Sequence, residues 1–150
     1  SQIKSCIDMS TGEMISDIPN WLNSKYEETD DFQVDSFFEM HGAALTALNF
    51  VSRADGAMRK AERLAIKKFC FDCGVHRMEI LNLIADRVKS YGKDTPANYG
   101  KALRLIALRD NAYKLLVFKA AQYMVHSDRT KKEAELNALD KMVKITGLIH

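Results

Sequence analysis

The chain has 150 residues, of which 47% are hydrophobic and 28% charged, and its formal net charge is +2. These values are typical of one globular domain and exclude a collagen-like or largely disordered chain. No apolar run approaches the roughly 20 residues that a membrane-spanning helix needs, so we expect no such helix.

Residues 1–34 are expected to form an N-terminal arm and an acidic linker. Residues 1–22 lack a clear helical pattern, and Thr11-Gly12-Glu13 indicates a turn. Residues 23–34 are polar and acidic, which is typical of a loop. Two interpretations of the arm stay open. It is either the tail of a preceding domain or a segment that packs Trp21 against the helical body.

From residue 35 onward, hydrophobic residues recur every three or four positions, which predicts helices almost throughout. Gly74, Gly92 and Gly147 are expected to end helices, and Thr95 and Asp110 to begin them. Residues 35–150 therefore form the predicted helical domain. Its fold class is all-α, a compact bundle of about six helices with two pseudo-repeated hairpins. The expected helices are 36–53, 58–73, 76–91, 96–108, 111–126 and 130–146. The residues expected to face inward include Leu64, Ala65, Phe69, Cys73 and Leu83. Thr130 is expected to open a capping box at the start of the last helix.

One element occurs twice in the helical part. Asp55 follows a long apolar helix and Glu62 comes seven residues later; Asp128 and Glu135 repeat this spacing after another apolar helix. Two such hairpins could bring four carboxylates together, and oxygen ligands suit Ca²⁺, Mg²⁺ or Mn²⁺. The alternative is that each acidic residue caps a helix or interacts favourably with its dipole.

At these residues the sequence resembles the TerB-like family, the α-helical domain of the tellurite-resistance protein TerB. The first copy of the motif is Ala54-Asp55-Gly56 with Glu62, and the second is Ser127-Asp128-Arg129 with Glu135. The resemblance covers about residues 36–149. It implies a compact helical domain associated with stress response and without established enzymatic activity. It also implies a divalent-metal site at Asp55, Glu62, Asp128 and Glu135.

The leading hypothesis is therefore a non-enzymatic interaction or sensing domain of a larger bacterial, cytoplasmic, stress-related protein. Its partner would be another protein or another domain of the parent chain. The N-terminal run from Cys6 to Glu13, with Trp21 and Leu22, is also similar to the tail of a WYL-like ligand-sensing module. This second resemblance implies that another domain precedes the helices.

A nucleic-acid-binding accessory domain is the alternative function. Residues 1–50 carry two basic and nine acidic residues, a net charge of −7, whereas residues 51–150 carry twenty basic and eleven acidic residues, a net charge of +9. Arg59, Arg63 and Lys67 are spaced to share one helix face that could meet phosphates, although an ordinary solvated face has the same pattern. A third hypothesis is a hydrolase with a metal-activated water at the four carboxylates. No common catalytic motif supports an enzyme.

The cysteines and histidines have simpler interpretations. Three cysteines are an odd number, which excludes a complete set of disulfides. Cys70 and Cys73 lie at the expected end of a helix, where the dipole disfavours a thiolate, so we expect buried, unreactive thiols and a reducing cytoplasm. His41 and His126 lie near apolar positions of helices. For such residues a hydrogen-bonded core or edge position is more common than metal ligation.

Overall fold

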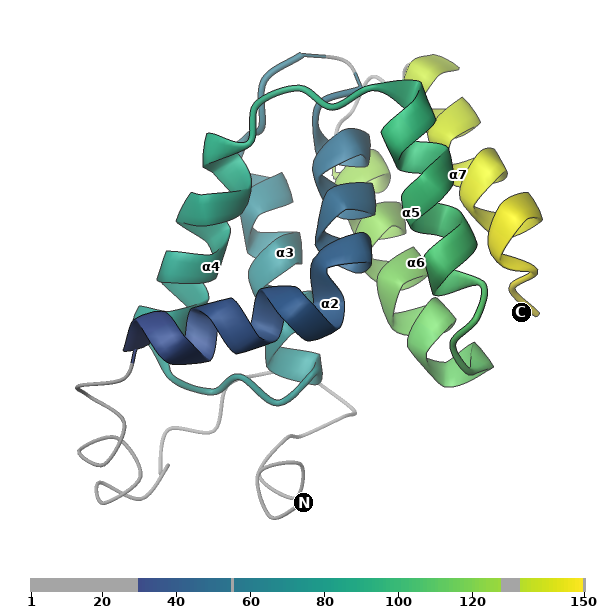
Figure 1. The fold of residues 1–150 in the computed structure, drawn as a ribbon. Coiled ribbons are helices and arrows are strands. Elements are labelled where there is room, and N and C mark those ends of the chain that lie inside the picture. Colours follow the sequence, from purple (N-terminus) through teal and green to yellow (C-terminus); the bar gives the residue numbers. More distant parts are fainter. Residues whose placement is uncertain (1–29, 55, 128–132, 150) are drawn as a thin grey trace.

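The computed structural model describes residues 30–54, 56–127 and 133–149, and within these ranges the chain is an all-α bundle without strands (Figure 1). The expected fold class is confirmed. None of the described helices is both long and apolar enough to cross a membrane. The helices are α2 (Asp30–Ser52), α3 (Lys60–Asp72), α4 (Met78–Ser90), α5 (Pro96–Ile106), α6 (Asn111–His126) and α7 (Glu133–Thr146).

Helix α2 begins at Asp30, earlier than the predicted residue 36, and Val34 is already part of the core. The prediction of a loop through residue 34 is therefore wrong for residues 30–34. Acidic residues are common in linkers, but they also favour the first turn of a helix through its dipole. The first part of α2 is fixed to α4, where Arg87 lies 2.7 Å from Asp35 and its guanidinium stacks over the ring of Phe38.

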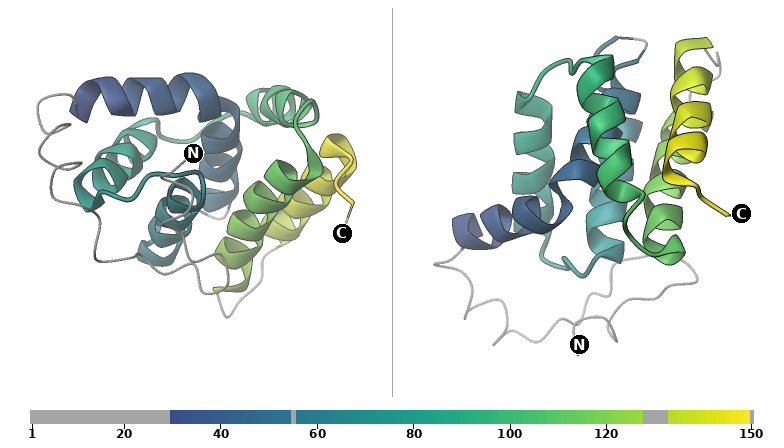
Figure 2. Two further views of the ribbon diagram at one scale, coloured as in Figure 1. Left: turned by 90° about the horizontal axis from the view of Figure 1, so that it is seen from below. Right: turned by 45° about the vertical axis from the view of Figure 1, so that its right-hand side comes forward.

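At His41 the backbone of α2 leaves helical geometry (φ −121°, ψ 15°), and the helix bends there. Gly42 follows directly, and glycine has a low helix propensity. Figure 1 shows the first part of α2 running across the front of the bundle and the second part turning into its centre. Both views in Figure 2 show the same change of direction. The bend gives one continuous helix contacts with α3, α4, α5, α6 and α7.

The bend is held by a buried aromatic junction, formed by Phe37, His41, Phe69 and Tyr113. His41 Nδ1 and the Tyr113 hydroxyl are 2.8 Å apart and share a hydrogen bond. The two rings are stacked at 5.6 Å, and each meets Phe69 edge-on at about 6 Å. This junction joins α2, α3 and α6, and it confirms the expectation of a hydrogen-bonded core position for His41.

The end of α2 is tied to the end of α4. The buried Asn49 side chain donates to the Gly92 carbonyl at 2.9 Å, and Arg53 donates to Asn49 Oδ1 at 2.9 Å and to the Lys89 carbonyl at 2.6 Å. The last carbonyls of a helix have no partner within it, and a cation is favourable at that end of the dipole. Arg53 and Asn49 therefore supply the C-terminal cap of α4.

Helix α5 is joined to α2 and α7 through one buried side chain, Tyr99. Its ring stacks on Phe50 of α2 with centroids 4.2 Å apart, and its hydroxyl donates to the Ala138 carbonyl of α7 at 2.5 Å. Burial raises the pKa of the Tyr99 hydroxyl well above its usual value. The hydroxyl therefore acts as a permanent donor between the two helices.

Most predicted helix ends are correct because local chemistry determines them. Gly74 has a φ of +107°, and its N–H and that of Val75 donate to Phe71 and Cys70, which is a Schellman end. The Thr95 and Asp110 side chains accept the backbone N–H groups of Asn98 and Tyr113 as N-caps. The capping box predicted at Thr130 lies outside the described residues.

Two residues predicted to face inward do not. Leu64 is 53% exposed and Leu83 is 38% exposed. By contrast, Ala65 and Phe69 are buried, and Cys73 is half-buried against the core. Periodicity correctly identifies the apolar stripe of α3, but Leu64 lies at its edge, where no other helix covers it.

The pH dependence of stability tests the aromatic junction. Burial and then the positive charge of Arg109 lower the pKa of His41 from 6.5 to about 4. The unfolded chain therefore binds a proton between about pH 6.5 and 4 that the folded chain excludes, so this residue lowers stability as the pH falls through that window. We expect a loss of at most about 3 kcal/mol. Urea unfolding of the wild type and of His41→Asn should diverge over this window, and parallel pH profiles would contradict the assignment.

The Tyr99 hydroxyl provides a second test. Tyr99→Phe removes a buried donor, and we expect it to lower the free energy of unfolding by about 1 kcal/mol. The matched control is Tyr123→Phe, because Tyr123 is 50% exposed. Chemical denaturation measures both variants. Equal stability of the two would show that the bond to Ala138 contributes nothing.

Candidate functional site

The two described members of the predicted metal site, Glu62 and Glu135, occupy equivalent positions. Each is the third residue of its helix, α3 or α7, and each is buried, with 4% and 1% of its surface exposed. This register supports the internal repeat. Glu62 Oε1 accepts the backbone N–H of Arg59 at 2.6 Å, which is the carboxylate half of a capping box. Glu62 therefore caps the start of α3.

The remaining predicted ligands, Asp55 and Asp128, lie outside the described residues. Within the described ranges, no three or more His, Cys, Asp or Glu side chains are grouped so that they could hold a metal ion. The four-carboxylate site for Ca²⁺, Mg²⁺ or Mn²⁺ therefore stays a prediction.

The basic stripe predicted on α3 faces α4. Arg63 forms an ion pair with Asp86 at 2.7 Å, and Lys67 donates to Asn82 Oδ1 at 2.9 Å. Arg59 lies at the N-cap position of α3. Two of the three predicted phosphate-binding cations are therefore engaged in joining α3 to α4, which reduces the charge that this face presents to a nucleic acid.

Cys70 agrees with the prediction of a buried thiol, whereas Cys73 is only half-buried. Cys70 is fully buried near the C-terminal end of α3, and burial raises the pKa of its thiol well above the usual value. A thiol in such a position stays protonated and is a poor nucleophile.

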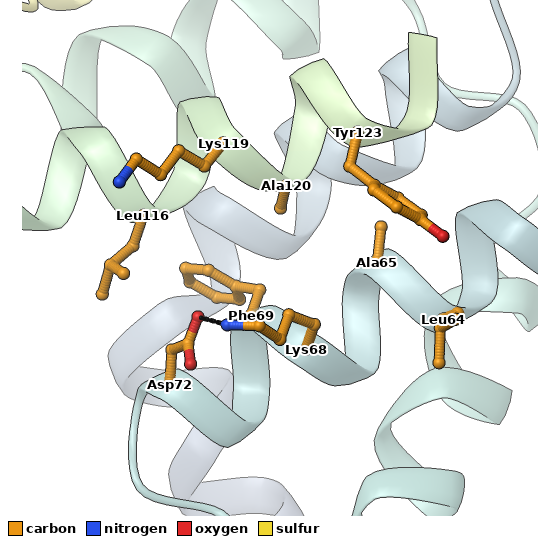
Figure 3. Close-up of a pocket in the computed structure, with 9 residues that line it drawn as sticks. All are labelled: Leu64, Ala65, Lys68, Phe69, Asp72, Leu116, Lys119, Ala120 and Tyr123. Carbon is orange, nitrogen blue, oxygen red and sulfur yellow. Dashed lines mark hydrogen bonds and ion pairs between the residues drawn. The ribbon is translucent and has the colours of Figure 1, made fainter. Parts of the chain in front are cut away.

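An apolar groove lies between α3 and α6. Its volume is about 430 Å³, within the range of ligand sites. Ala65 and Ala120 face each other across it, and the small side chains leave a hollow between the two helices (Figure 3). It is lined by Leu64, Ala65, Lys68, Phe69, Asp72, Leu116, Lys119, Ala120 and Tyr123.

The groove combines a fixed floor with exposed apolar walls. The floor is Phe69, whose ring is held by His41 and Tyr113 in the junction described above. Leu64 and Tyr123 are about half exposed on the walls, at 53% and 50%. These two half-exposed side chains leave apolar surface in contact with water on either side of the hollow. A bound partner would remove that surface from water.

Two lysines and one carboxylate give the groove its polar character. Lys68 and Lys119 are exposed, and Lys68 Nζ lies 2.5 Å from Asp72 Oδ2 (Figure 3). The Asp72 side chain is only 10% exposed. Its second oxygen, Oδ1, is buried, and no described residue donates a hydrogen bond to it. A buried acceptor without a donor costs about 1–3 kcal/mol.

Sequence reasoning did not identify this groove. Periodicity predicts Leu64 in the core, and no sequence pattern marks Leu116, Tyr123 or Asp72 individually. One signal was present. Helix α6 is apolar on more than one side, with Leu115, Leu116, Val117 and Phe118 in succession, and such a helix has more than one face to cover.

Comparisons with known proteins add no assignment. No model of a known protein family matches this chain, and no significant match was found among curated proteins or among solved structures.

The capping role of Glu62 can be tested by substitution. Glu62→Ala should lower the free energy of unfolding by about 1–2 kcal/mol, because it leaves the first turn of α3 without its acceptor. The matched control is Glu79→Ala in the first turn of α4, where the side chain is 69% exposed. Thermal or chemical denaturation without divalent metal measures both. Equal losses for the two variants would contradict the cap.

Proposed function

We propose that this chain is a non-enzymatic interaction domain whose α3–α6 groove holds an apolar segment of a protein partner. The observation that carries the proposal is the apolar hollow between the two helices, with Leu64 and Tyr123 half exposed on its walls and Lys68 and Lys119 beside it. Ligand sites typically pair a mostly apolar surface with few placed polar groups.

The chemistry of the groove defines its occupant. Leu64, Leu116 and Tyr123 favour an aromatic or branched apolar side chain. Lys68 and Lys119 favour acidic residues beside it. The expected occupant is therefore a protein segment in which tryptophan or leucine stands among aspartate and glutamate.

This proposal keeps the non-enzymatic role that the TerB-like resemblance implies, including a place in a larger stress-related protein. It moves the contact surface from the acidic turns to the groove. Nucleic-acid binding is the weaker alternative because Arg63 and Lys67 are engaged with α4.

Selection from a library of displayed random peptides tests the groove. We expect the full chain to enrich peptides that combine tryptophan or leucine with acidic residues. Leu64→Asp should weaken their binding about tenfold, a change of about 1.4 kcal/mol. The matched control is Leu105→Asp, because Leu105 is 55% exposed but lies outside the groove. Equal loss in both variants, or no enrichment by the wild type, would contradict the proposal.

A further inference from the structure

The walls of the α3–α6 groove offer an occupant no backbone groups to pair with. Both walls are helical, so their N–H and C=O groups are bonded within α3 and α6. The described part of the chain also has no sheet edge to which a strand could add. An extended segment would therefore bury some of its own N–H and C=O groups without partners. A helix brings these hydrogen bonds with it, so the groove suits a helical occupant.

The side chains that line the groove follow the ridges of the two helices. Leu64 and Lys68 are four residues apart on α3, and Leu116 and Ala120 have the same spacing on α6. Rows with this spacing form the ridges of a helix, and the space between two rows can accept the ridge of a third helix. Ala65 and Ala120 provide that space. The next equivalent position along the groove is one helical turn away, about 5.4 Å, which matches side chains at positions i and i+4 of the occupant.

The groove is about two helical turns long. From Leu64 to Asp72, α3 rises about 12 Å, and from Leu116 to Tyr123, α6 rises about 10 Å. This length accommodates two apolar anchors of a helix, fewer than the series of anchors by which longer amphipathic helices dock in grooves.

The two ends of the groove differ in charge. Leu64 and Tyr123 lie at an apolar end, whereas the ammonium groups of Lys68 and Lys119 lie toward the opposite end (Figure 3). Asp72 is bonded to Lys68 there, so the exposed Lys119 adds the excess positive charge. The C-terminal end of a helix carries a partial negative charge. A helical occupant with its C-terminal end at Lys119 is therefore complementary to the groove.

We propose that the occupant of the α3–α6 groove is a two-turn amphipathic helix with apolar side chains at positions i and i+4 and an acidic side chain at its C-terminal end. The first anchor lies between Leu64 and Tyr123, and the second lies over Phe69 beside Leu116. The acidic side chain meets Lys119. This inference rests on the proposed function and names the conformation and direction of the partner at the same site.

Two peptides of about 14 residues and equal composition test the helical occupant. One has leucines at i and i+4, which share a face of a helix, and the other has them at i and i+2, which share a face of a strand. We expect the first to bind the full chain about tenfold more tightly and to gain helical circular dichroism when bound. Leu64→Asp should remove this preference, and Leu105→Asp should keep it. Equal affinities of the two peptides, or tighter binding of the i and i+2 peptide, would overturn the proposal.

Charge reversal tests the direction of the helix. With the acidic residues of the first peptide placed after its second leucine, Lys119→Glu should weaken binding about tenfold. Lysines in place of those acidic residues should restore it. The matched control is Lys101→Glu, because Lys101 is exposed on α5 outside the groove. Equal effects of the two variants, or no restoration by the lysine peptide, would overturn the assigned direction.

The peptide selection separates this inference from the proposed function. Enriched peptides that depend on Leu64 but carry proline between their anchors would support the interaction site and refute the helical occupant. A wild type that enriches no peptide would contradict both proposals. Analytical ultracentrifugation tests the competing occupant, a second copy of the chain. A wild-type dimer that Leu64→Asp converts into monomers, while Leu105→Asp does not, would also overturn both.

Discussion

The hydrogen bond between His41 and Tyr113 is the interaction on which the rest of the arrangement depends. It lies where α2 leaves helical geometry, and it fixes the direction of both parts of that helix. The first part then reaches α4 through Asp35 and Arg87, and the second reaches α5 through Phe50 and Tyr99. Burial keeps the imidazole neutral, so the bond avoids the cost of a buried charge.

The same junction determines the character of the candidate site. Phe69 belongs both to the junction and to the floor of the α3–α6 groove, so the floor is immobilised by packing on its other side. The walls differ from it. Leu64 and Tyr123 are half exposed, and the Asp72 carboxylate is buried without a described donor to Oδ1. A rigid floor beneath incompletely covered walls is the arrangement expected of a preformed binding surface.

The bundle was predictable because its helices are marked locally. Thr95, Asp110 and Gly74 act at the helix ends through their own backbone neighbours. The groove was not predictable, because periodicity assigns Leu64 to a stripe without showing which helix covers it. The bend at His41 and the burial of Asp72 depend on contacts distant in sequence. The metal site and the TerB-like resemblance stay predictions, since Asp55 and Asp128 lie outside the described residues.

The central claim is that the α3–α6 groove holds an apolar segment of a protein partner. The most direct measurement is the affinity of the selected peptides for the full chain and for the variants Leu64→Asp and Leu105→Asp. The account predicts a loss of about tenfold for Leu64→Asp and no loss for Leu105→Asp. Equal affinities of the two variants, or no peptide binding by the wild type, would contradict it.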